Sequence, residues 1–274
     1  MKLCRYESAD GSVRWGELIS DSKAVPLTGV PWGGEGVVRP AGPAETVRRL
    51  LAPVEPPAIF CIGLNYREHA RETGAAIPTH PVVFMKQPGA IQHPGEPIIL
   101  PRGLASQQVD FEGELVVVIG RRCKNVQPSA AASVIYGYTC GNDVSARDWQ
   151  KQWGGGQFCR GKTFDTFAPV GPVVVSADEL GDPQALPITT RVNGKEMQKD
   201  STGGMIFSVA ELVAFLSGST TLYPGTLIFT GTPSGVGMAR QPPVYLKAGD
   251  RVEVEIGGIG VLVNPVVEES VASV

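Results

Sequence analysis

Two glutamates stand directly before a run of apolar residues in the stretch Asp110-Phe111-Glu112-Gly113-Glu114-Leu115-Val116-Val117-Val118-Ile119. The five consecutive apolar residues predict a strand that is buried on both faces. Because residues two apart in a strand point the same way, Glu112 and Glu114 share one face, and two valines continue that face. The strand therefore carries two carboxylates into the mouth of an apolar element.

Two carboxylates in such a place repel each other and lose hydration, which costs free energy. A bound hard cation relieves both costs, and a ligand set made only of oxygen points to Mg²⁺ or Mn²⁺. The alternative is an exposed strand edge on which Glu112 and Glu114 are simply solvated. The strand alone leaves these two interpretations open.

The composition is that of a globular protein with many turns. The chain has 274 residues, 42% of them hydrophobic, and a net charge of −3 with both signs interspersed. We therefore expect a substantial core and no nucleic-acid partner. No apolar stretch reaches the length of a membrane span. The 34 glycines and 23 prolines favour short connections, and hence a β-rich chain.

The cysteines and the N-terminus predict a cytosolic location. The five cysteines are odd in number and form no CxxC pair, so reduced thiols are the simplest interpretation. Residues 1–7 lack the apolar core of a signal peptide. We expect a cytosolic protein without disulfide bonds.

We predict a small N-terminal β-rich domain over residues 1–55 and a larger domain over residues 56–274. The first is expected to hold short strands and one short helix over residues 46–51. The strands expected in the second cover residues 58–62, 82–86, 97–100, 133–140, 188–192, 195–198 and 227–230, with a final hairpin over 252–263. Strands outnumber helices and do not alternate with them, so the predicted class is α+β, mostly β, rather than a doubly wound fold.

Two local signals define elements of the larger domain. Asn193-Gly194 is the strongest short-range signal for a β-hairpin. Ser208 and Glu211 form a capping box at the start of an apolar helical pattern that ends near Ser217.

A histidine and a glutamate share one face of a predicted helix over residues 67–73. His69 and Glu72 lie at positions i and i+3, within hydrogen-bonding reach of each other. A carboxylate partner orients an imidazole and raises its basicity, which is the arrangement that activates water. The alternative is a solvated polar helix, since its neighbours are also charged.

Asp143 follows the strand predicted over residues 133–140. It serves there either as a helix N-cap or as the third carboxylate ligand of the cation site that the two glutamates would form. Arg147 and Asp148 follow within two turns, and they either support the cation site by hydrogen bonds or pair on the surface.

Lys162 stands among apolar and small residues. If it is buried near the acids it stabilises a developing oxyanion, and otherwise it is an exposed loop lysine. The glycine-rich loop over residues 229–237 offers N–H groups and hydroxyls to a carboxylate. This loop lacks the P-loop pattern, so we expect no nucleotide site.

Taken in order, these segments resemble the fumarylacetoacetate hydrolase family. The matching motifs are Ile62-Gly-Leu-Asn-Tyr-Arg-Glu-His69-Ala-Arg-Glu72, Phe84-Met-Lys86, Asp110-Phe-Glu112-Gly-Glu114, Asn142-Asp143-Val-Ser-Ala-Arg-Asp148, Arg160-Gly-Lys162-Thr-Phe-Asp-Thr-Phe, Met205-Ile-Phe-Ser and Thr230-Gly-Thr-Pro-Ser-Gly-Val-Gly. The likeness runs from about residue 58 to the C-terminus. It implies a mixed β-sandwich roll, usually dimeric, with a divalent metal, Mg²⁺ or Mn²⁺, in the mouth of the roll.

The resemblance also implies roles for nine residues. It makes Glu112, Glu114 and Asp143 the metal ligands, His69 and Glu72 the catalytic pair on a lid helix, Lys162 a catalytic oxyanion contact, and Gln150, Gly231 and Thr232 substrate contacts. A further metal aspartate of fumarylacetoacetate hydrolase itself has no counterpart upstream, which groups this chain with the shorter acylpyruvate-type members.

The function that this resemblance implies is a metal-dependent hydrolase. It would cleave the C–C bond of a 2,4-dioxo acid of the acylpyruvate or fumarylpyruvate type, giving pyruvate and a carboxylic acid, with His69 deprotonating the attacking water. The alternative is an oxaloacetate decarboxylase, or an isomerase or hydratase of a related 2-oxo acid, because the same enolate arises. A homodimer is expected, and a metal-stabilised binding protein without activity is the non-enzymatic alternative.

Overall fold

The apolar run that follows Glu114 forms the central strand β10 (Gly113–Ile119), and all seven of its residues are buried. Leu115, Val117 and Ile119 belong to one apolar cluster, whereas Val116 and Val118 belong to a second cluster on the opposite face. The prediction of a strand buried on both faces is therefore confirmed.

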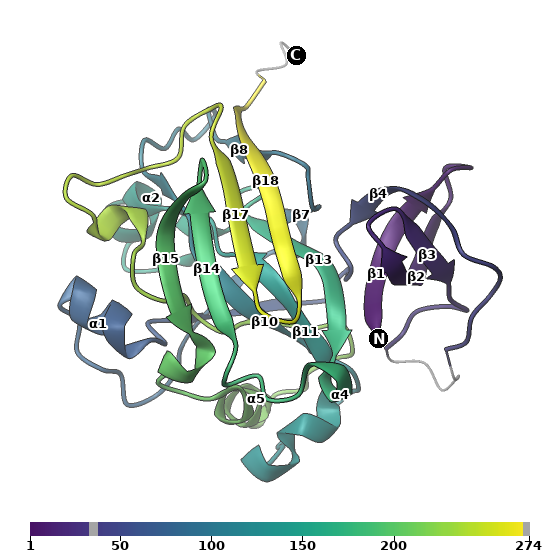
Figure 1. Cartoon of the computed structure of the whole chain (residues 1–274). Helices are drawn as coiled ribbons and strands as arrows, with labels where there is room; N and C mark the ends of the chain where they lie inside the picture. Colours follow the sequence, from purple (N-terminus) through teal and green to yellow (C-terminus); the bar gives the residue numbers. More distant parts are fainter. Residues whose placement is uncertain (33–37, 271–274) are drawn as a thin grey trace.

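The computed structural model describes residues 1–32 and 38–270 (Figure 1). Residues 33–37 and 271–274, which fall in the two predicted domains, lie outside the described residues. The strands of the larger sheet follow the order β2 (Val13–Ser20), β3 (Lys23–Pro26), β4 (Glu45–Leu51), β1 (Lys2–Ser8), β13 (Ala168–Ser176), β11 (Ile135–Asn142), β10, β16 (Leu227–Phe229), β5 (Ile59–Gly63) and β6 (Val82–Lys86). The short β7 (Ile91–Gln92) pairs with β13.

A second sheet packs against the middle of the first. Its order is β15 (Lys195–Ser201), β14 (Pro187–Val192), β17 (Arg251–Ile256), β18 (Gly260–Glu268) and β8 (Ile98–Leu100). Ile188 and Val254 from this sheet share an apolar cluster with Leu115 of β10, so the core lies between the two layers. Figure 1 shows β14, β15, β17 and β18 in front of β10 and β11. Strands β16 and β5 are parallel while most other pairs are antiparallel, so the sandwich is mixed.

A glycine between the two glutamates allows this close packing. A Cβ atom on Gly113 would lie 2.0 Å from Thr190 Oγ1 in β14, which is far inside van der Waals contact. The Gly113 N–H also donates to Gln198 Oε1 at 2.9 Å. The Glu-Gly-Glu pattern thus brings the second sheet onto the strand that carries the acids.

The N-terminal strands extend the larger sheet. Strand β1 pairs antiparallel with β13, so the sheet continues from the first residues into the body of the protein. The predicted helix over residues 46–51 is wrong, because these residues form β4, which pairs with β1 and β3. Tertiary pairing has overridden the helix propensity of the leucines and arginines there. The division into residues 1–55 and 56–274 stays a prediction.

The helices are short and lie at the margins of the sheets. They are α1 (Arg67–Thr73), α2 (Arg147–Lys151), α3 (Cys159–Lys162), α4 (Ala177–Leu180) and α5 (Val209–Ser217), with 3₁₀ turns η1 (Pro88–Ala90), η2 (Pro128–Val134), η3 (Thr202–Gly204) and η4 (Gly237–Ala239). A two-stranded ladder joins β9 (Val109–Asp110) to β12 (Ser145–Ala146). Across residues 1–32 and 38–270, every helix is too short or too polar to span a lipid bilayer.

The predicted local signals are confirmed. Ser208 and Glu211 form a complete capping box at α5. Asn193 and Gly194 both have positive φ in the turn between β14 and β15, as a tight hairpin turn requires. All five cysteines are free. The predicted α+β, mostly β class is also confirmed.

Candidate active site

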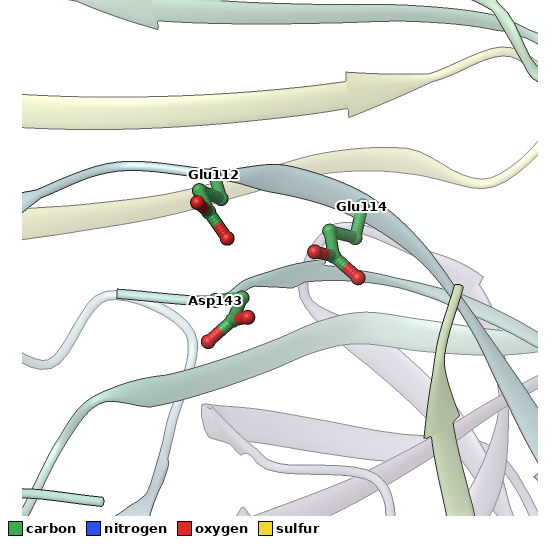
Figure 2. A group of neighbouring side chains, drawn as sticks. All are labelled: Glu112, Glu114 and Asp143. Carbon is green, nitrogen blue, oxygen red and sulfur yellow. The ribbon is translucent and has the colours of Figure 1, made fainter. Parts of the chain in front are cut away.

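Three carboxylates meet where β10 begins and β11 ends. Antiparallel pairing sets Gly113 opposite Asn142, so Asp143 leaves its strand beside the two glutamates. The Asp143 N–H donates to the Glu112 carbonyl oxygen at 2.8 Å and fixes this corner. One carboxylate oxygen from each of Glu112, Glu114 and Asp143 lies within 4.8 Å of the others (Figure 2). The structure thus brings together the three predicted metal ligands, and Asp143 is not a helix N-cap.

Two basic side chains neutralise part of this cluster. Lys162 places Nζ 2.6 Å from Glu112 Oε2 and 2.7 Å from Asp143 Oδ2. Arg147 places Nη2 2.6 Å from Glu112 Oε1 and 2.9 Å from Asp110 Oδ2. Lys162 is 2% exposed, so it is buried beside the acids rather than free on a loop.

A third cation, Lys86 at the end of β6, also contacts the cluster. Its Nζ lies 2.7 Å from Asp143 Oδ1. Its three N–H donors are nevertheless directed to backbone carbonyls, those of Val144, Lys162 and Phe167. Asp143 Oδ1 is therefore a buried oxygen that receives no hydrogen bond. An oxygen with free lone pairs at this position fits a metal ligand.

Burial and neighbouring charges act differently on the two glutamates. Burial, together with the Asp143 and Glu112 carboxylates, raises the pKa of Glu114 well above its usual value. Burial also acts to raise the pKa of Glu112, but Arg147 and Lys162 outweigh it and hold that pKa below its usual range. Burial opposes the charge on Lys162, yet Asp143 and Glu112 raise its pKa overall. Glu114 is thus the carboxylate whose charge the protein leaves uncompensated.

The residues present fit a hard divalent cation. The cluster joins four carboxylates, those of Asp110, Glu112, Glu114 and Asp143, to the three cations Lys86, Arg147 and Lys162. The net charge of the cluster is therefore −1. Binding of a divalent cation would change this net charge to +1. The donor atoms are all oxygen, which Mg²⁺ and Mn²⁺ prefer.

Helix α1 carries the predicted base at the same pocket. His69 Nδ1 lies 3.1 Å from Glu72 Oε2, and His69 is 8% exposed. Glu72 Oε1 accepts the Gly235 N–H at 2.9 Å, which ties α1 to the glycine-rich loop. Because Nδ1 faces a carboxylate, Nε2 is the ring nitrogen left for a substrate.

A cavity of about 240 Å³ joins these groups. Six of the nine predicted residues line it, namely His69, Glu112, Glu114, Gln150, Lys162 and Thr232. Glu72, Asp143 and Gly231 do not line the cavity, but each contacts a residue that does, namely His69, Lys162 and Glu114. The Gly231 N–H donates to Glu114 Oε2 at 2.8 Å. Gly231 has φ 99°, and a Cβ there would lie 2.6 Å from Asn65 Cβ, so a larger residue does not fit.

Sequence reasoning gave no role to two members of the cluster, Lys86 and Asp110. Asp110 accepts the backbone N–H groups of Gly237 and Met238 at 2.8 and 3.0 Å, in addition to its pair with Arg147. Its position two residues before Glu112 was the available signal, because that spacing puts both side chains on one strand face.

The two residues expected to support the acids behave differently. Arg147 contacts the cluster directly. Asp148 instead accepts hydrogen bonds from Ser106 Oγ at 2.8 Å and from the Gln107 N–H at 3.0 Å. It anchors the loop before β9 and contacts none of the three predicted ligands.

Comparisons with known proteins point to one family. The family profile described as Fumarylacetoacetate (FAA) hydrolase C-terminal matches residues 58–267. The mitochondrial oxaloacetate tautomerase FAHD2A of Bos taurus is 49% identical over 218 residues, which are 79% of this chain and 69% of that protein. The human protein of the same name is 45% identical with the same coverage.

Solved structures share the whole fold. The 5-carboxymethyl-2-hydroxymuconate delta-isomerase from Mycobacterium smegmatis has a TM-score of 0.82 at 38% identity, covering 98% of this chain and 100% of that one. The fumarylacetoacetate hydrolase from psychrophilic Exiguobacterium antarcticum has a TM-score of 0.85 at 38% identity with the same coverage.

The comparisons also correct one prediction and settle another. The cytosolic location was wrong, because both curated relatives are named as mitochondrial proteins. Free thiols are compatible with any reducing compartment, so the cysteines do not single out the cytosol. The resemblance stated from the motifs is confirmed, since the profile covers most of the chain and two relatives and two folds agree with it. The chain therefore belongs to the fumarylacetoacetate hydrolase family.

Proposed function

We propose that this chain is a metal-dependent keto–enol isomerase of a 2-oxo acid of the oxaloacetate type. The observation that carries the proposal is the His69–Glu72 pair, which shares one small pocket with the three carboxylates. Moving a proton between carbon and oxygen requires a base beside the carbon and positive charge beside the oxygen. The pocket offers both.

The size and charge of the pocket support a small anionic substrate. Its volume of about 240 Å³ lies below the range of roughly 300–1,000 Å³ that is typical of larger organic ligands. With a divalent cation bound, the cluster carries a net positive charge that attracts a carboxylate. The names of the relatives, oxaloacetate tautomerase and delta-isomerase, support the same class of reaction.

The residues divide the work. A divalent cation held by Glu112, Glu114 and Asp143 would supply Lewis-acid stabilisation of negative charge on the 2-oxo oxygen. In the direction of enol formation, His69 Nε2 takes a proton from C3 of the keto acid, and in the opposite direction it returns that proton. Glu72 holds Nδ1 and stabilises the imidazolium that forms.

Two further side chains bind and orient the substrate. Lys162 Nζ, held by two carboxylates, adds fixed positive charge beside the oxygen that becomes the enolate. Gln150 accepts a hydrogen bond from Arg147 Nη1 through Oε1 at 3.0 Å, which leaves its amide N–H groups to donate to the substrate. Both roles are part of the proposal.

The hydrolase expected from the sequence and the decarboxylase share this enolate. Hydrolysis additionally requires His69 to activate a water molecule at C4, whereas decarboxylation requires no base. The names of the two tautomerases and of the delta-isomerase favour isomerisation for this chain, whereas the Exiguobacterium antarcticum protein is named a hydrolase and is less similar than the tautomerases. The homodimer implied by the resemblance remains a prediction, which sedimentation analysis tests.

The test follows the enol absorbance of oxaloacetate with Mg²⁺ or Mn²⁺ and after EDTA treatment. We expect metal-dependent loss of the enol without release of CO₂. His69→Gln lowers the rate by roughly 100-fold or more, the contribution of a positioned base, while His80→Gln, which removes an exposed histidine, leaves it unchanged. Release of CO₂ would favour the decarboxylase, cleavage of an acylpyruvate the hydrolase, and no turnover would overturn the proposal.

A further inference from the structure

The proposed function leaves one basic residue of the pocket without a role. Helix α2 presents Arg147, Gln150 and Lys151 at positions i, i+3 and i+4, which share one helix face, and all three line the cavity. Arg147 already has acidic partners, because it donates to Gln150 and pairs with Asp110 and Glu112. Its charge is therefore compensated before any substrate binds.

Lys151 has no such partner. In the described part of the chain it forms no ion pair, whereas the other lysine and the arginine of the cavity lining are both paired with acids. Lys151 is exposed to solvent and lines the cavity, where partial desolvation and then the nearby Arg147 lower its pKa. An anion beside it would stabilise the charged form of this lysine.

The location of Lys151 relative to the acids defines where that anion would be. Arg147 contacts Glu112 at the inner end of α2, and Lys151 lies four residues further, an advance of about 6 Å along the helix. A four-carbon diacid bound with its 2-oxo acid end at the three carboxylates has a second carboxylate within the reach of a lysine side chain at that distance. Lys151 is the available cation for it.

We infer that Lys151 binds the distal carboxylate of the substrate and makes the site select 2-oxo dicarboxylates over 2-oxo monocarboxylates. The inference rests on the proposed function in placing the 2-oxo acid end of the substrate at the carboxylate cluster. Lys151 takes no part in the proton transfer, so its contribution is to binding and specificity rather than to turnover.

The test measures the binding of two unreactive analogues to the Mg²⁺-loaded protein by titration calorimetry. Malate keeps the distal carboxylate, and 2-hydroxybutanoate carries a methyl group in its place. We expect malate to bind wild type roughly five- to tenfold more tightly, the size of a charge-assisted contact at a partly exposed site. The 2-hydroxybutanoate measurement serves as the internal control for every variant.

Three substitutions and one matched control sharpen the result. Lys151→Met keeps the aliphatic stem and brings the affinity for malate close to that for 2-hydroxybutanoate, and Lys151→Glu lowers it further. Lys151→Arg keeps most of the preference. Lys124→Met, which removes an exposed lysine outside the cavity, changes neither affinity.

Three outcomes would overturn the inference: no binding of malate to wild type, an unchanged affinity for malate in Lys151→Met, or an equal loss for both analogues. Failure of the proposed function is separate, because it appears as the absence of oxaloacetate turnover by wild type. A preference for malate without turnover would leave Lys151 as the dicarboxylate contact and remove the isomerase. Turnover without a preference for malate would support the isomerase and remove Lys151 as the dicarboxylate contact.

Discussion

Ion pairs of the same length occur in two regions of this protein and have different consequences. On the N-terminal strands, Arg48 and Arg49 approach Glu7 at 2.6 and 2.7 Å. At the active site, Arg147 approaches Glu112 at 2.6 Å. The side chain of Arg48 is 66% exposed, whereas that of Arg147 is 5% exposed.

The surroundings, and not the distances, determine what each pair contributes. Water and salt screen the surface pairs, and holding two long side chains in place opposes their attraction. In the buried cluster each charge has lost its hydration, so every group needs a partner. One buried carboxylate, Glu114, lacks such a partner, so a bound cation would compensate its charge. The ion pairs on the N-terminal strands leave no buried carboxylate that needs a cation.

The largest effect is expected from removing a buried cation. Arg147→Met leaves Glu112 and Asp110 without their guanidinium partner, and the loss should lower the free energy of unfolding by about 3–5 kcal/mol and abolish turnover. Urea denaturation measures the change in the free energy of unfolding. Arg122→Met, which removes an exposed arginine, should cause little change.

A double variant sharpens this prediction. In Arg147→Met, Glu112 keeps its pair with Lys162, whereas Asp110 loses its cation. Adding Asp110→Asn to Arg147→Met removes that stranded charge, so part of the lost stability should return. If the single variant were as stable as wild type, the acids would be solvated and the contrast between the two regions would fail.

A smaller effect of opposite sign is expected at Glu114. Glu114→Gln removes an uncompensated buried charge and keeps an oxygen to accept the Gly231 N–H. The melting temperature of the metal-free protein should rise by roughly 2–4 °C, about 1 kcal/mol, and the increase caused by added Mg²⁺ or Mn²⁺ should disappear. Glu268→Gln, at an exposed position, is the control. A Gln variant still stabilised by metal would remove Glu114 from the ligand set.

A third prediction concerns pH and the junction between the regions. His93 Nδ1 accepts the Ala52 N–H at 3.0 Å, just after β4, so it must be unprotonated there. Burial first, and then Arg5 and Arg49, lower the pKa of His93 below 6.5. A histidine with a lowered pKa contributes stability that is fully present above pH 6.5 and is lost as the pH falls through the folded pKa.

His93→Asn tests this contribution, because Asn offers an acceptor oxygen that does not titrate. The pH profile of stability below pH 6.5 should become flatter, with a change of about 1 kcal/mol, the size of one hydrogen bond. The matched substitution His80→Asn should leave the profile as it is. An unaltered slope in His93→Asn would show that the histidine does not couple the N-terminal strands to pH.

The smallest effect is expected on the surface. Arg48→Ala breaks its pair with Glu7, and Arg49 still contacts the same carboxylate. The melting temperature should change by less than about 2 °C, and the change should vanish at high salt. A loss comparable to that of Arg147→Met would erase the distinction between the two regions.

The parts of the fold that could be predicted are those specified by neighbouring residues. The apolar run of β10, the Asn193-Gly194 turn and the Ser208 capping box each depend on a few adjacent positions, and each is confirmed. Strand β4 was not predicted, because its backbone partners lie in β1, about 40 residues earlier in the chain. The residues around β4 carry no local pattern that predicts this pairing.

The same distinction holds for the candidate site. The spacings of Glu112 with Glu114 and of His69 with Glu72 are short, so strand and helix periods were enough to pair them. The contact of Lys86 with the cluster was not predicted, because its side chain is positioned by hydrogen bonds to residues such as Val144, which lies 58 residues away in the chain. The motif Phe84-Met-Lys86 matches the family, but its local pattern does not show that the carbonyls of Val144, Lys162 and Phe167 surround the lysine.

The most direct test of the account is the incorporation of deuterium at C3 of oxaloacetate in D₂O, followed by NMR with wild type and His69→Gln, each with Mg²⁺ and with EDTA. The account predicts that only metal-loaded wild type accelerates the exchange above the rate without enzyme. Equal exchange by His69→Gln, or exchange that EDTA does not reduce, would contradict it, because the base and the carboxylate cluster would then not serve one proton transfer.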